Sequence, residues 1–118
     1  MARLIDSSVF VALERWGEPL YALEALVADA PFAMASISAS ELLAGLYRTE
    51  TIEQRERRSA FLDEVFNGLS ILPFDLDVAR THARVYAELR AVGQLIGPND
   101  LIIAATAITH GYDVLTYN

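Results

Sequence analysis

Short apolar segments alternate along this chain with longer segments of helical periodicity, and this alternation constrains the fold more than any other feature. We expect buried strands at residues 2–5, 32–37, 69–74 and 113–116. Helical patterns, with apolar residues three and four positions apart, fill the intervals. Strands alternating with helices predict an α/β domain whose central, mostly parallel sheet is flanked by helices on both faces. Without a repeat or a linker, residues 1–118 are expected to form a single domain.

Several residues predict where the helices begin and end. Ser38 is expected to open a helix, and Asp75 to cap a long one that reaches Val92. Pro98 suits the first position of the last helix, and Gly111 suits its C-terminal cap. Inward-facing positions are expected in three of the helices, at Leu20, Leu23, Leu26, Val27, Ile52, Phe61, Leu62, Val65, Phe66, Val78, Val85, Tyr86 and Leu89.

The composition restricts the location and chemistry of the protein. Its apolar fraction of 53% is high, yet the longest apolar stretch, Leu101 to Ile108, is far shorter than the ~20 residues of a membrane span. Asp6 lies where a signal peptide would be apolar, so we expect a cytoplasmic protein without a membrane association. The absence of cysteine excludes disulfides and thiolate chemistry. The surplus of apolar residues suggests that a partner covers part of the surface.

The net charge of −7 is unfavourable for binding nucleic acid, but all nine basic residues are arginines, which suit bidentate phosphate contacts. Four of them cluster in one stretch: Arg48, Arg55, Arg57 and Arg58. They form either a phosphate-binding cluster or a solvated helix face paired with Glu50, Glu53 and Glu56. The second interpretation is the simpler one.

Three acidic residues are expected near one edge of the sheet. Asp6 follows the first strand, Glu41 lies one turn into the helix after the second strand, and Asp100 lies in the first turn of the last helix. Active sites of parallel sheets lie beyond the carboxyl ends of the strands. Three converging carboxylates would repel each other and favour a hard divalent cation such as Mg²⁺ or Mn²⁺. Such a site can hydrolyse a phosphodiester.

Each acid also has a purely structural interpretation. Asp6 can cap the helix that begins at Ser7. Glu41 can complete a capping box with Ser38. Asp100 is favoured by the helix dipole whatever the function. From spacing alone, neither interpretation excludes the other.

Other polar residues favour structural roles or exclude other enzyme classes. Asp75 and Asp77 fit helix capping, and His82 and His110 lack metal-binding spacing. No histidine lies near Ser7 and Ser8 in the sequence to support a hydrolase triad. A receiver domain needs a lysine that this chain lacks, and a haloacid-dehalogenase-like phosphatase needs an Asp-x-Asp motif that Asp6 does not begin.

The order of motifs resembles that of PIN-domain ribonucleases, especially VapC toxins of bacterial toxin–antitoxin pairs. The matching stretches are Leu4-Ile5-Asp6-Ser7-Ser8, Ser38-Ala39-Ser40-Glu41-Leu42-Leu43-Ala44-Gly45, Ile96-Gly97-Pro98-Asn99-Asp100 with the apolar run after it, and Val114-Leu115-Thr116-Tyr117-Asn118. No single stretch is specific, but the ordered set spans essentially the whole chain.

This resemblance implies roles for particular residues. Asp6, Glu41 and Asp100 would be the catalytic acids that bind Mg²⁺ or Mn²⁺. Ser8 would position a water or a neighbouring carboxylate, and Thr116 and Asn118 would line the pocket. Many relatives carry an acid at or soon after the position of Asn118, so we expect one firmly held metal rather than two.

The resemblance also implies an activity and partners. It implies a metal-dependent endoribonuclease toxin that cuts tRNA or ribosomal RNA, forms a homodimer and is neutralised by a VapB-type antitoxin. The last strand or C-terminal tail of the fold is expected to be missing from the sequence. The alternative is a noncatalytic PIN fold that binds RNA or a protein without cutting.

Overall fold

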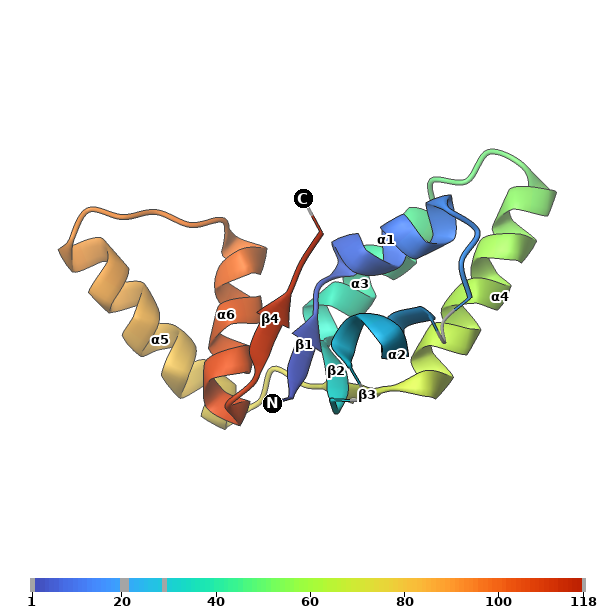
Figure 1. The fold of residues 1–118 in the computed structure, drawn as a ribbon. Coiled ribbons are helices and arrows are strands. Elements are labelled where there is room, and N and C mark those ends of the chain that lie inside the picture. Colours follow the sequence, from blue (N-terminus) through green and yellow to red (C-terminus); the bar gives the residue numbers. More distant parts are fainter. Residues whose placement is uncertain (1, 20–21, 29, 118) are drawn as a thin grey trace.

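Four parallel strands form the centre of the molecule in the order β3-β2-β1-β4 (Figure 1). The computed structural model describes residues 2–19, 22–28 and 30–117. The strands are β1 (Arg3–Ile5), β2 (Phe32–Ala35), β3 (Ser70–Leu72) and β4 (Asp113–Leu115). Every neighbouring pair runs parallel, which confirms the predicted α/β class.

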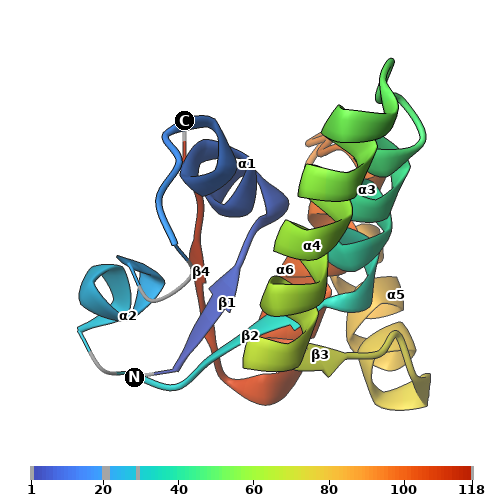
Figure 2. The ribbon, with the colours of Figure 1, turned by 90° about the vertical axis from the view of Figure 1, so that its right-hand side faces the viewer.

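Helices cover both faces of this sheet, as predicted (Figure 2). They are α1 (Ser7–Arg15), α2 (Ala22–Val27), α3 (Ser36–Leu46), α4 (Ile52–Gly68), α5 (Leu76–Ala91) and α6 (Pro98–His110). Helices α1, α2 and α4 contribute to one core, and α6 lies against the other face. Helix α5 packs mainly against α6 and extends away from the sheet (Figure 1).

Alternating side chains of the strands divide the core into two parts. In β1, fully buried Ile5 packs with Phe10, Leu13 and Leu23, whereas its neighbour Leu4 packs with Ile103. This follows from strand geometry, because successive side chains point to opposite faces of a sheet. The two cores hold α1 and α6 on opposite sides of β1.

The order of the strands reverses at β1, because β2 and β3 lie on one side of this strand and β4 lies on the other. Leu4 of β1 pairs with Ala33 of β2 on one side and with Val114 of β4 on the other. Strand β1 is therefore flanked by an early strand and by the last one. In parallel α/β sheets, such a switch point opens a crevice beyond the carboxyl ends of the two strands. Asp6 follows β1 at this crevice.

Local sequence signals located several helix ends correctly. The carboxylate of Asp75 accepts a hydrogen bond from the backbone N–H of Val78 and caps α5. Pro98 occupies the first turn of α6, and Gly111 ends this helix in the left-handed conformation at φ 71°. These predictions are confirmed because each depends on backbone chemistry within one turn.

The predicted start of α3 was wrong by two residues. The helix begins at Ser36, directly after β2, and its N-cap, Ala35, offers no side-chain hydrogen bond. Ser38 consequently lies inside the first turn and is fully buried. It cannot form a capping box with Glu41, so that structural interpretation of Glu41 is excluded.

Three residues predicted to face inward are exposed instead. The exposed fractions are 58% for Leu26, 73% for Ile52 and 47% for Tyr86. Leu26 belongs to a helix of only six residues, and Ile52 opens α4 beyond the reach of the core. Tyr86 lies on α5, which has a neighbour on one side only. Leu20 lies outside the described residues.

Among the described residues, no helix combines the length and the apolar character that crossing a membrane requires.

Candidate active site

Asp6 lies at the junction between β1 and α1, where it has two structural roles. It is the N-cap of α1, and its Oδ2 accepts a 3.4 Å hydrogen bond from the backbone N–H of Ser8. The capping role predicted for Asp6 is therefore confirmed. Within the described residues, all hydrogen bonds to the Asp6 side chain reach Oδ2. The other carboxylate oxygen remains available to a ligand.

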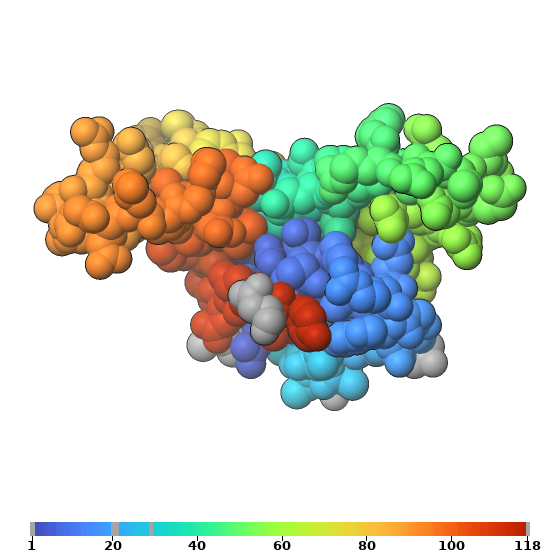
Figure 3. Space-filling model, turned by 90° about the horizontal axis from the view of Figure 1, so that it is seen from above, coloured from blue at the N-terminus to red at the C-terminus, as the bar shows by residue number. Residues whose placement is uncertain are grey.

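Two hydroxyl groups fix the orientation of the Asp6 carboxylate. The Ser8 hydroxyl donates to Oδ2 of Asp6 at 2.6 Å, and the Thr116 hydroxyl lies 3.2 Å from the same oxygen. Ser8 Oγ also accepts a 3.0 Å hydrogen bond from the backbone N–H of Tyr117. The segment after β4 is thus tied to the start of α1. In the view onto the carboxyl edge of the sheet, the blue start of α1 and the red segment after β4 lie side by side (Figure 3).

Asp100 shares a pocket with Asp6. It occupies the first turn of α6, whose N-cap is Gly97. The pocket has a volume of about 290 Å³ and is lined by Asp6, Asp100, Ile103, Ala104, Val114 and Thr116. Two carboxylates that are far apart in the sequence therefore line one pocket, beyond the carboxyl ends of β1 and β4. Thr116 lines the same pocket.

Glu41 adjoins this pocket through two hydrogen-bonded neighbours. Its Oε1 accepts a 3.2 Å hydrogen bond from the Ser7 hydroxyl, and its Oε2 accepts a 3.5 Å bond from the Asn99 side-chain amide. Ser7 follows Asp6 and Asn99 precedes Asp100, so each bond links Glu41 to one of the other acids. Glu41 itself lines a neighbouring hollow beside Phe10 and Leu42.

Ser7 and Asn99 had no role assigned from the sequence, although each is adjacent to an expected site residue. No single-sequence pattern indicates that both side chains turn towards α3, because that depends on how three separate elements pack. The signal that could have found them was their position beside Asp6 and Asp100.

The three acids do not form a ready-made ligand cluster. Across residues 2–19, 22–28 and 30–117, no three carboxylate or imidazole groups come close enough together to hold a metal ion. Two carboxylates in one pocket still fit Mg²⁺ or Mn²⁺, because magnesium commonly binds one or two carboxylates and completes its shell with water and substrate phosphate. The donor oxygens are hard, as these cations require. Asn118 lies outside the described residues.

The arginine-rich stretch does not form the predicted pairs within one helix. In the part of the chain that the structure describes, Arg48, Arg55, Arg57 and Arg58 form no ion pairs with the glutamates at 50, 53 and 56. Arg58 instead pairs with Glu14 of α1 at 3.0 Å, and Arg55 lies over the ring of Tyr47. The histidines pack edge-on against aromatic rings, His82 against Phe74 and His110 against Tyr112.

Comparison with known families identifies this arrangement. The profile of the PIN domain matches residues 3–118. The chain belongs to the PIN-domain family. Asp6, Glu41 and Asp100 of this PIN domain thus all lie within the matched region.

Named relatives of this PIN domain are ribonucleases. It is 37% identical over 125 residues to Ribonuclease VapC1 of Rickettsia felis, covering 100% of the chain and 86% of the relative. It is 36% identical over 115 residues to Ribonuclease VapC5 of Mycobacterium tuberculosis, covering 98% and 82%. The resemblance to the VapC branch is therefore confirmed.

Solved structures similar to this PIN domain come from toxin–antitoxin complexes. One is VapBC2 from Rickettsia felis bound to a promoter DNA fragment, with a TM-score of 0.84 and 27% identity over 100% of this chain and 88% of that one. Another is VapBC-5 of Mycobacterium tuberculosis, a member of a toxin–antitoxin family, with a TM-score of 0.75 and 32% identity over 99% and 85%. The predicted PIN-like fold is confirmed.

Proposed function

We propose that this PIN domain is a metal-dependent endoribonuclease toxin of the VapC type that cleaves tRNA or ribosomal RNA. The observation that carries the proposal is the shared pocket of Asp6 and Asp100 at the switch point of the sheet. The ribonuclease relatives, similar over the whole chain, support RNA as the substrate.

Asp6 and Asp100 are the residues that would hold Mg²⁺ or Mn²⁺. Such a cation, when bound, lowers the pKa of a coordinated water and stabilises the charge that develops on a phosphodiester. Ser8 and Thr116 keep Oδ2 of Asp6 engaged, so that its other oxygen faces the ligand. This restricts the carboxylate to one orientation before the cation and the RNA arrive.

Glu41 has a different part in this proposal. Its two oxygens are already engaged by Ser7 and Asn99, one residue away from Asp6 and Asp100 respectively. We assign Glu41 to positioning these two neighbours at the edge of the site. Glu41 then acts as a positioning residue through Ser7 and Asn99, because it does not line the pocket of the two aspartates.

The test is cleavage of total tRNA and ribosomal RNA by the purified chain, free of any antitoxin. Reactions contain Mg²⁺, Mn²⁺ or EDTA, and the variants are Asp6→Asn, Asp100→Asn and Glu41→Gln. Asp77→Asn, the same chemical change on exposed α5, is the matched control. Discrete cuts that need metal and both pocket aspartates, but not Asp77, are the expected result.

Absence of cleavage by the folded chain, together with an absence of metal binding, would overturn the proposal. The noncatalytic interpretation would then account better for the conserved shape of the fold. Cleavage that persists in EDTA would instead exclude the metal while leaving a ribonuclease.

A VapB-type antitoxin and a homodimer belong to the same proposal. The solved relatives are complexes that contain an antitoxin, which supports a partner of this kind. Helix α5 has only Val78 buried, while Leu76 and Val92 at its ends are exposed, so a second copy has an apolar surface to cover. Sedimentation of the purified chain distinguishes monomer from dimer.

A cytoplasmic location is also part of the proposal, because the proposed substrates, tRNA and ribosomal RNA, are found there.

A further inference from the structure

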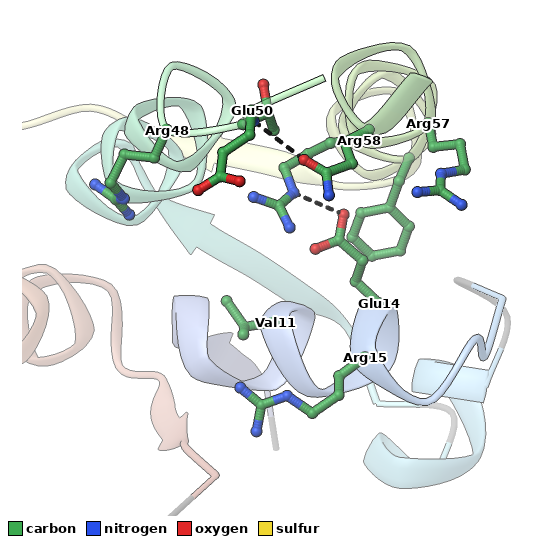
Figure 4. A pocket seen from close by; sticks show the side chains of 10 residues that line it. Val11, Glu14, Arg15, Arg48, Glu50, Arg57 and Arg58 are labelled. Carbon is green, nitrogen blue, oxygen red and sulfur yellow. Dashed lines mark hydrogen bonds and ion pairs between the residues drawn. The ribbon is translucent and has the colours of Figure 1, made fainter. Parts of the chain in front are cut away.

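A groove rich in arginine runs between α1 and α4 (Figure 4). These two helices lie on the side of the sheet opposite to α5 (Figure 1). Its volume is about 770 Å³. One wall is α1; the other is the end of α3, the connection to α4, and α4 itself. The lining residues are Val11, Glu14, Arg15, Arg48, Thr49, Glu50, Gln54, Arg57, Arg58 and Phe61. Four of the nine arginines of this acidic chain therefore face one hollow.

Three of these four arginines are not engaged by carboxylates. Arg58 is held in place, because it pairs with Glu14 at 3.0 Å and donates to the carbonyl of Gly45 at 3.1 Å. Among the described residues, Arg15, Arg48 and Arg57 form no ion pair, and all three side chains are exposed. Figure 4 shows their guanidinium groups on both walls of the groove. Their charge is available to an anion.

Arg48 and Arg58 both extend past Gly45 at the inner end of the groove. A methyl group on Gly45 would lie 3.7 Å from a terminal nitrogen of Arg48 and 3.7 Å from one of Arg58. Glu14 compensates the charge of Arg58, whereas Arg48 has no ion pair among the described residues, so Arg48 is the arginine at this end that can take up a further anion. Guanidinium groups match phosphate oxygens in a bidentate geometry, which makes phosphate the anion of choice.

The groove leads towards the proposed catalytic edge. A second hollow, about 150 Å³, shares Val11, Arg48 and Arg58 with the groove and reaches Glu41. Glu41 in turn contacts Asn99, the neighbour of Asp100. A chain of phosphates lying along the arginines would therefore arrive at the acids that the proposed function assigns to cleavage.

We propose that this groove binds the sugar–phosphate backbone of the RNA on one side of the cleavage point. The inference rests on the proposed function for the identity of the polyanion. It also explains how a chain of net charge −7 can bind RNA, because the binding cations are concentrated where the strand must pass. On the opposite side of the molecule, Arg84 pairs with Glu88, and the hollow between α5 and α6 is lined mainly by apolar side chains, with no arginine among its described lining residues.

The test measures binding of total tRNA in EDTA, so that cleavage plays no part. The groove variant is Arg48→Gln with Arg57→Gln, and the control of equal charge is Arg80→Gln with Arg84→Gln on α5. Loss of two phosphate contacts should weaken binding roughly tenfold or more and reduce the slope of log K against log salt by roughly 1.5. The control should retain the wild-type slope. Glu50→Gln, which removes a repelling carboxylate from the groove, should strengthen binding.

Three outcomes would overturn the inference. Equal weakening by the groove and control variants would mean that only net charge matters. Unchanged RNA binding by the groove variant, with loss of binding to an antitoxin, would make the groove a protein interface. Unchanged binding to both would leave the groove without this role. Wild-type chain that binds RNA through the groove, but neither binds Mg²⁺ or Mn²⁺ nor cuts the RNA in their presence, would overturn the proposed function alone.

Discussion

The hydroxyl of Ser8 donates a 2.6 Å hydrogen bond to Oδ2 of Asp6, and it does so while accepting one from the backbone N–H of Tyr117. One small side chain thus joins the carboxylate that follows the first strand to the segment that follows the last. Its removal disturbs both the orientation of Asp6 and the position of that segment.

We therefore expect Ser8→Ala to impair RNA cleavage more than it impairs stability. Partners that orient metal-binding carboxylates typically change metal affinity or activity by roughly 10–100-fold when removed. The free energy of unfolding should fall by only about 1–2 kcal/mol, the usual value of the two hydrogen bonds that this hydroxyl makes. Cleavage rates and urea unfolding of Ser8→Ala are compared with Ser59→Ala on α4. Wild-type cleavage by Ser8→Ala would remove Ser8 from the site.

Two substitutions of Asp6 should separate its capping role from its charge. Asparagine caps helices as well as aspartate does, so Asp6→Asn should keep α1 intact and leave the metal-free stability unchanged or raised by up to ~1 kcal/mol. Alanine cannot cap, so Asp6→Ala should cost about 1 kcal/mol. Both should abolish cleavage. Chemical unfolding in EDTA provides the measurement, and a large loss in Asp6→Asn would contradict the view that its charge is dispensable for folding.

Divalent metal should stabilise the folded chain through the two aspartates that share a pocket. At a metal concentration 100-fold above its dissociation constant, the gain is about 2.7 kcal/mol, or a rise in Tm of roughly 10 °C. Asp100→Asn should abolish this rise. Glu41→Gln should reduce it less, because Glu41 lies outside the shared pocket. Melting curves with Mn²⁺ and with EDTA test this; equal loss in both variants would place Glu41 among the direct ligands.

The two described ion pairs should differ in their contribution to stability. Arg58 reaches Glu14 on another helix and also binds the carbonyl of Gly45, so Arg58→Ala should destabilise the fold by roughly 1–2 kcal/mol. Arg84 pairs with Glu88 one turn away on the surface of α5 at 3.4 Å, so Arg84→Ala should change stability by less than about 0.5 kcal/mol. Thermal unfolding of both variants decides the point. A loss of stability in Arg58→Ala as small as that in Arg84→Ala would show that the ion pair between α1 and α4 adds little to stability.

Sequence signals predicted those parts of the fold whose physics is local. Asp75, Pro98 and Gly111 mark helix ends because each satisfies or removes a backbone group within its own turn. The order of strands and helices was likewise predictable from apolar periodicity. The start of α3 was missed because Ala35 passes directly from strand to helix without a capping side chain, and no residue type signals such a transition.

The candidate site was predictable as a set of acids but not as a geometry. Asp6 follows a predicted strand and Asp100 lies in the first turn of a predicted helix, and these positions predicted that both side chains lie at the same edge of the sheet. That Glu41 is held by Ser7 and Asn99 depends on how α1, α3 and α6 pack, which no local pattern encodes. The ion pair of Arg58 with Glu14, 44 residues away, was missed for the same reason, since glutamates of its own helix offered nearer partners.

The pairing of β1 with β4 has a consequence for the time course of synthesis. Thr116, which holds the carboxylate of Asp6, lies 110 positions further along the chain. A ribosome therefore finishes α6 and β4 only after every earlier element has emerged, and until then Asp6 faces an open sheet edge without its last neighbour. The pocket that Asp6 and Asp100 share therefore cannot assemble on a nascent chain before α6 and β4 have been synthesised. Translation that stops before β4 releases a fragment carrying Asp6 and Glu41 but no assembled pocket.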